Sequence, residues 1–193
     1  MKKEIFIPLT LLLLLLGCSS KENYYQLHTL QTQNKHQQSR HYKNRYIGIA
    51  EVEVAEYLNK PELSTRISSG RTIVHDNERW REDFSKNIQS VLKYNLSKYD
   101  ARYTFISYPW EEPIDDNYRI YLTLDKFDGD SNGLVTIEGR WSLINRHTDK
   151  ILLSESIWKQ YQGDKSLENI VDTQSILLDS LSQEMIHKIH SVI

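Results

Sequence analysis

Cys18 is the residue whose type and position point most directly to chemistry, because it is the only cysteine in the 193-residue chain. A lone cysteine excludes a disulfide within the chain. The residues before it comprise a short cationic start, Met1–Lys3, and an apolar stretch, Ile5–Leu16. This arrangement is typical of a secretory signal, and it is shorter than the roughly 20 residues that a membrane span needs. We therefore expect residues 1–17 to be a signal peptide.

The junction Leu15-Leu16-Gly17-Cys18 resembles the lipobox of bacterial lipoproteins. In those proteins the cysteine thiol receives a diacylglyceryl group, and cleavage exposes an amine that can be acylated in turn. The resemblance implies S-diacylglyceryl and N-acyl chains on Cys18, and we expect no other cofactor. Two or three acyl chains anchor a protein stably, at about 0.8 kcal/mol per buried methylene. By the same resemblance, Ser19 permits sorting to the outer membrane, where we expect the domain to face the periplasm.

The segment Asp128–Gly133 matches the first half of a calcium-binding loop, with oxygen side chains at positions 1, 3 and 5 and glycine at position 6. Position 12 of such a loop should be a bidentate glutamate, but it falls on Gly139, and Glu138 lies one residue too early. The flanking residues also read as strands, whereas a calcium loop joins two helices. We interpret the segment as a hairpin turn.

Two other groups of reactive side chains favour plain structural interpretations. Among the seven histidines, His28, His36 and His41 in the polar segment fit no common ligand spacing. His187 and His190 lie three apart and could hold a metal, but no nearby carboxylate or cysteine completes a site, so we expect no metal site. A proline-bounded cluster of carboxylates suits acid/base work, but a surface loop explains it better; its members are Glu111, Glu112, Asp115 and Asp116. No nucleotide-binding or triad spacing is present, and we expect no enzyme.

Composition limits the partners that the chain can bind. The chain has 24 basic and 26 acidic residues, and removal of residues 1–17 changes its formal net charge from −2 to −3. Nucleic-acid binding would favour a basic surface, so we expect no nucleic-acid partner. The remaining 176 residues are enough for one domain of ordinary size.

The elements that must position any binding residues begin after a polar segment. Residues 18–45 have too little apolar surface to fold alone, so we expect a tether, in which Tyr24–Leu27 could form a short edge strand. Alternating apolar residues predict a strand over Tyr46–Val54, with a phase slip between Ala50 and Glu51 that suggests a bulge. A hairpin with a Ser-Gly turn follows at residues 63–75, and further strands are expected at 103–108, 118–127, 135–145 and 151–160.

Two amphipathic helices complete the pattern. Apolar residues at spacings of three and four predict a helix capped by Asp76 or Asn77 that runs from Trp80 to Leu96. A second pattern of this kind predicts a helix over residues 166–190. The sequence thus indicates a single α+β domain over 46–193, with a mostly antiparallel sheet and two helices packed on one face.

Several short segments, taken in order, resemble the ABC-type transport auxiliary lipoprotein family, in its paraquat-inducible protein C-like branch. No single segment is specific, and the likeness rests on their order together with the lipobox. The segments are Tyr25–Leu27, Ile49–Val54, Tyr57–Leu63, Asn77–Trp80, Tyr108–Trp110, Tyr118–Ile120, Phe127–Gly133 and Gly139–Leu143.

The resemblance implies an accessory role in an MCE-type system that moves lipids or other hydrophobic molecules between the two membranes. It implies self-association into a homo-oligomer that docks a periplasmic MCE protein like paraquat-inducible protein B. It also implies a second partner in the inner membrane, like paraquat-inducible protein A. The alternative is a structural or assembly lipoprotein of the envelope, such as a cell-wall synthesis regulator or a secretion-channel subunit. A lipidated hydrolase is a more distant alternative.

Two loops are candidates for contacting a partner. Tyr57, Leu58 and Leu63 flank Pro61 and would form an apolar patch if they were exposed. Trp110, beside Pro109, is the second candidate. The alternative for both is that these side chains anchor the loops in the core.

Overall fold

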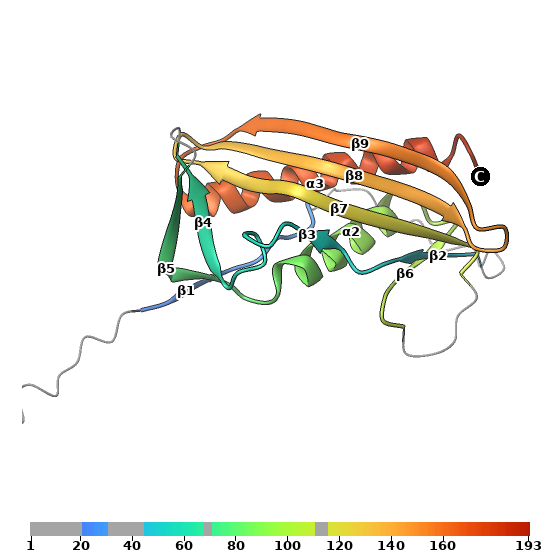
Figure 1. The fold of residues 1–193 in the computed structure, drawn as a ribbon, viewed down its shortest axis with the longest axis horizontal. Helices are drawn as coiled ribbons and strands as arrows, with labels where there is room; N and C mark the ends of the chain where they lie inside the picture. The colour runs from blue at the N-terminus through green and yellow to red at the C-terminus, as the bar shows by residue number, and fades with distance from the viewer. Residues whose placement is uncertain (1–20, 31–44, 68–70, 111–115) are drawn as a thin grey trace, which may run out of the picture.

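The computed structural model describes residues 21–30, 45–67, 71–110 and 116–193. Cys18 and the expected signal peptide lie outside these residues, as do His36, His41, Glu111, Glu112 and Asp115. Within the described residues, two helices pack on one side of a nine-stranded sheet (Figure 1). The α+β fold expected from the sequence is therefore confirmed.

The sheet is built around β7, which pairs on one side with β8 and on the other with three short strands. The strands are β1 (Asn23–Tyr25), β2 (Tyr46–Ile49), β3 (Glu53–Val54), β4 (Glu62–Arg66), β5 (Thr72–Trp80), β6 (Thr104–Ser107), β7 (Tyr118–Asp130), β8 (Leu134–Asn145) and β9 (Lys150–Gln162). The long pairs β7–β8 and β8–β9 and the hairpin β4–β5 are antiparallel. The pairs β1–β5, β2–β6, β2–β7, β3–β7 and β4–β7 are parallel. The sheet is thus mixed, and mostly antiparallel.

The helices α2 (Phe84–Tyr99) and α3 (Leu167–Ile189) pack against each other and against the sheet (Figure 1). Ser166 caps α3 by accepting a hydrogen bond from the backbone N–H of Asn169. Between helices and sheet lies one core, to which alternate residues of β7 and β8 contribute. Its fully buried members on these two strands include Ile120, Leu122, Leu124, Phe127, Val135, Ile137 and Leu143.

The N-terminal end of α2 differs from the expectation. Asp76 and Asn77 lie inside β5, and the cap is Asp83, whose carboxylate accepts hydrogen bonds from the N–H groups of Ser85 and Lys86. Trp80 is the last residue of β5, and its ring stacks on Phe84 at 4.3 Å between centroids. The predicted cap was wrong because the end of β5 pairs with β1, which is more than fifty residues away in sequence.

The phase slip between Ala50 and Glu51 is confirmed as a break between two strands. Ile49 pairs with Ile120 and Glu53 with Thr123, so the chain gains one residue relative to β7. The extra residue lets Ile49 and Val52 both lie in the core.

Residues 21–30 belong to the folded domain, although the sequence suggested that they were part of a tether. The edge strand expected near Tyr24–Leu27 is found as β1, which pairs with the end of β5. Leu27 is buried in the core, and its backbone N–H donates to Asn87 Oδ1 on α2 at 2.6 Å. The polar composition of the segment did not predict this attachment, because only the three residues of β1 and the buried Leu27 make it.

Candidate functional site

The candidate partner surface is the side of the long strands that is turned away from the helices. We call it the open face. Because side chains alternate along a strand, its members are the neighbours of the core residues. They are Arg119, Tyr121, Thr123, Lys126 and Asp128 on β7, Thr136, Glu138 and Arg140 on β8, and Trp158 and Gln160 on β9.

Asp128 organises one end of the open face. Its carboxylate, almost fully buried, accepts hydrogen bonds from Arg66 Nε at 2.6 Å and from the Tyr57 hydroxyl at 3.0 Å. Burial and the Asp128 carboxylate raise the pKa of Tyr57. Thr136 Oγ1 accepts a further bond from Gln160. The hydroxyl of Tyr57 is therefore held against the sheet. Tyr57 is 38% exposed, so part of its side chain faces solvent.

The segment Asp128–Gly133 is a hairpin turn, as expected. Asp128 is committed to Arg66 and Tyr57, and Asp130 Oδ1 accepts bonds from the N–H groups of Asn132 and Leu134. Gly133 has a φ of 85°, which glycine adopts without strain. The carboxylates thus serve the strand ends and the turn.

Trp110 organises the other end of the open face. The Arg119 guanidinium lies 4.9 Å from the centre of its ring and forms a two-pronged ion pair with Asp116 at 2.7 and 2.9 Å. These hydrogen bonds raise the pKa of Arg119. Gly48 on β2 leaves the space that this cluster fills, because a Cβ there would lie 2.6 Å from Asp116 Oδ2. Asp116 is therefore part of a structural ion pair.

Between these ends the open face carries exposed aromatic side chains. Trp158 on β9 is 66% exposed and lies opposite Glu138, and Tyr121 on β7 is 37% exposed. Lys126 and Glu138 form an ion pair at 3.7 Å beside them. Because tryptophan is enriched among the residues that dominate interface energies, Trp158 is a candidate contact for a partner.

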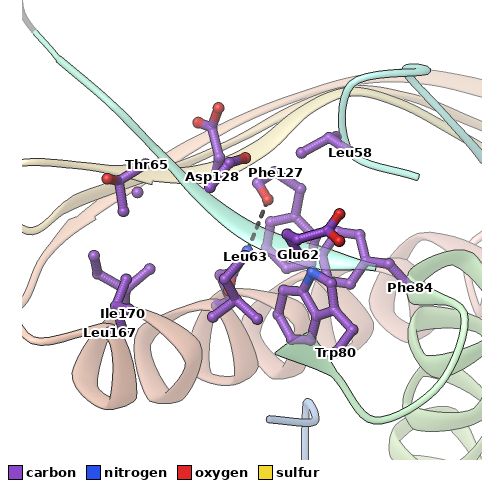
Figure 2. Close-up of a pocket in the computed structure, with 13 residues that line it drawn as sticks. Leu58, Glu62, Leu63, Thr65, Trp80, Phe84, Phe127, Asp128, Leu167 and Ile170 are labelled. Atoms are coloured by element: carbon purple, nitrogen blue, oxygen red, sulfur yellow. Dashed lines mark hydrogen bonds between the residues drawn. The ribbon is translucent and has the colours of Figure 1, made fainter. Parts of the chain in front are cut away.

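Leu58 and Leu63 do not belong to the open face. Both are buried, at 6% and 3% exposure, and they point into a small cavity between β4, β7 and α3 (Figure 2). The cavity holds about 20 Å³, room for roughly one water molecule. The alternative interpretation, in which this loop is anchored in the core, therefore holds for the two leucines, whereas partner contact by Tyr57 and Trp110 stays a prediction.

Asp100 joins the C-terminal ends of the two helices. It accepts hydrogen bonds from Arg102 at 3.1 Å and pairs with His190 Nε2 at 2.7 Å. His190 is thus engaged by a carboxylate, and the described residues contain no cluster of three or more His, Cys, Asp or Glu that could hold a metal ion. Burial alone would raise the pKa of Asp100, but the bonds from Arg102 and His190 outweigh it and lower this pKa below 3.8.

Asp100→Asn is expected to reduce the free energy of unfolding by about 2 kcal/mol at neutral pH, because charged hydrogen bonds are lost in a buried place. The folded-state pKa lies below the unfolded value, so the carboxylate stabilises the fold above about pH 4 and this contribution disappears as pH falls. Urea unfolding at several pH values measures the difference. The control is Asp149→Asn, which removes an exposed ion pair and should change stability little. A difference from wild type that persists unchanged in acid would contradict this role.

Sequence reasoning missed the ion pair of Arg66 with Asp128, which it had considered only as a turn residue, and the exposed Trp158. Arg66 and Asp128 meet only through the parallel pairing of β4 with β7. Trp158 carried a usable signal, since in a strand with the alternation of β9 it falls on the face opposite Ile157, which is buried.

Comparison with known proteins places the chain in a family of accessory transport lipoproteins. The family model for the ABC-type transport auxiliary lipoprotein component matches residues 25–186. The chain belongs to this family. No curated protein resembles it closely enough to count as a match.

Two solved structures share the fold. A crystal structure of an uncharacterized protein has a TM-score of 0.73 at 18% identity, covering 88% of this chain and 99% of the other. Protein XCC0632 from Xanthomonas campestris has a TM-score of 0.68 at 12% identity, covering 88% and 98%. No helix among the described residues is long and apolar enough to cross a membrane.

Proposed function

We propose that this protein is an outer-membrane lipoprotein that docks the periplasmic subunit of an MCE-type lipid transport system. The observation that carries the proposal is the family match over residues 25–186, which begins seven residues after a cysteine in a lipobox-like junction. In this role Cys18 carries the diacylglyceryl and N-acyl chains, and the folded domain projects into the periplasm. Ser19 supports the outer membrane as the destination.

The open face is the surface we assign to the MCE partner. In the part of the chain that the structure describes, no helix covers it. It carries exposed aromatic side chains together with residues held rigidly at both ends, at Asp128 and Arg119. Rigid aromatic anchors contribute a large share of binding energy at protein interfaces. Self-association of several copies, and a complex with an inner-membrane protein like paraquat-inducible protein A, are further parts of the proposal.

The test is recovery of partners from cell envelopes by crosslinking and purification of the full-length lipidated protein. Wild type should recover an MCE protein. Trp158→Ala should weaken that complex by about 2 kcal/mol, roughly thirtyfold in affinity, as expected for loss of an interface anchor. Tyr94→Ala is the matched control, because Tyr94 is 61% exposed but lies on α2, away from the open face.

Two outcomes would contradict the proposal. Wild-type protein that recovers no MCE protein from envelopes in which one is present would argue against the docking role. Recovery of a peptidoglycan synthase instead would favour the structural or assembly role. Equal losses of affinity for the MCE protein in Trp158→Ala and Tyr94→Ala would contradict the assignment of the open face as the contact surface.

A further inference from the structure

The first described residues are fixed to the body of the domain by a series of separate contacts. β1 pairs with β5 from Asn23 to Tyr25, and Glu22 pairs with Arg79 at 3.2 Å. The chain then crosses both helices. The backbone N–H of Leu27 donates to Asn87 on α2, and that of His28 donates to Ser175 on α3 at 3.2 Å.

The crossing segment ends at Leu30, near the C-terminal end of α2. The carbonyl of Leu30 accepts a hydrogen bond from Lys98 Nζ at 3.1 Å, and the same ammonium pairs with Asp179 of α3 at 2.9 Å. The N-terminal segment thus lies on the helix side of the domain and follows α2 from its first turns to its last. Its starting point, Glu22, cannot move independently of the domain.

This attachment limits the length of free chain between the lipid and the fold. Cys18 lies four residues before Glu22, and four extended residues span at most about 14 Å. The domain is longer than that, because α3 alone has 23 residues and extends about 34 Å. The position of Glu22 in the fold therefore decides which part of the domain lies near the membrane.

We propose that the domain stands on the lipid surface on one defined end, the anchor end, made of Lys21–Tyr24 with Arg79. This inference rests on the lipid anchor of the proposed function. Figure 1 shows β1 beginning at one end of the molecule, with the β8–β9 turn and the C-terminus at the other. The N-terminal end of α3 lies at the same end of the molecule as β1. There Glu168 and Asp172 line a shallow cleft with Asn23 and Tyr24.

The side chains of the anchor end suit a lipid interface. Tyr24 is 60% exposed, and tyrosine favours the boundary between head groups and water because its ring is apolar and its hydroxyl polar. Charges are mixed here, with Lys21 and Arg79 beside Glu22 and Glu168. The contact is therefore set by the short covalent link and by Tyr24, and it does not need anionic lipids.

The test uses the full-length lipidated protein in vesicles of phosphatidylethanolamine and phosphatidylglycerol that carry a head-group acceptor dye. A donor dye is placed on Glu168→Cys, in the first turn of α3 beside the anchor end, or on Thr148→Cys in the β8–β9 turn. Both positions are exposed, and an acylated Cys18 takes no thiol label. Energy transfer should be at least about threefold greater from position 168 than from position 148, because the two ends are separated by roughly the length of α3. Phosphatidylcholine vesicles should give the same contrast.

Flotation of unlabelled wild type with the vesicles separates the two ideas under test. Flotation with equal transfer from both positions, or more from position 148, would overturn the orientation and leave the anchor standing. Failure to float would overturn the anchor and the orientation together. A long Gly-Ser insertion after Ser20 should keep flotation but lower transfer from position 168, and unchanged transfer would contradict the short link as the cause.

Discussion

Cys18→Ser is expected to move the protein out of the outer-membrane fraction almost completely. On the proposed lipidation, the Cys18 thiol is the acceptor of the diacylglyceryl group, so the variant would lose two acyl chains at about 0.8 kcal/mol per buried methylene. The protein should accumulate as precursor or as released material. Fractionation of envelopes with immunodetection measures the shift.

The control for this experiment is Ser20→Ala, which leaves the thiol and the residues before it unchanged. It should fractionate with the membrane as wild type does. Mass spectrometry of the wild-type N-terminus gives an independent measurement, with acyl chains expected on Cys18. A Cys18→Ser protein that still fractionates with the outer membrane would show that acylation is not the anchor.

Phe127→Ala is expected to reduce the free energy of unfolding by about 3–5 kcal/mol, the usual range for removing a buried phenylalanine ring. Phe127 is fully buried, and its ring lies 5.8 Å from that of Phe84 between centroids. It also lines the small cavity in Figure 2, so its removal would enlarge an existing void. The melting temperature should fall by on the order of 10 °C. Denaturant unfolding of the wild-type and variant proteins measures the change in the free energy of unfolding.

Tyr121→Ala is the matched control, because Tyr121 lies on the same strand but on the open face. The expected loss is below about 1 kcal/mol, since its ring is partly exposed. Similar losses for the two variants would contradict the assignment of β7 faces to core and open surface.

The sequence predicts most of the fold because the long elements have strong periodicity. α3 is found at Leu167–Ile189 within the expected range, and β7, β8 and β9 lie within a few residues of their predictions. The predicted start of α2 was wrong because the position of Trp80 fits the spacing of a helix as well as the end of a strand. Only pairing with the distant β1 decides between the two.

The candidate site was less accessible to sequence reasoning. A loop pattern cannot show whether an apolar side chain points inward, and Leu58 and Leu63 are buried where they line the small cavity with residues of β7 and α3. Tyr57 lies on the open face only because Asp128 receives its hydroxyl, a contact between residues 71 positions apart. The expectation for Cys18 needed no such contact, since it rests on the residues that immediately precede it, and it stays a prediction.

The parallel pairing of β1 with β5 also determines how the domain would respond to a pulling force between the two membranes. Tension on an acylated N-terminus would act along the axis of β1, so the hydrogen bonds from Asn23 to Tyr25 would be loaded together, in shear. Beyond them, the buried Leu27 and the contacts of its backbone with α2 would resist withdrawal of the segment. If Cys18 is acylated as proposed, these contacts would carry tension from the lipid to the core before the segment could detach from its end.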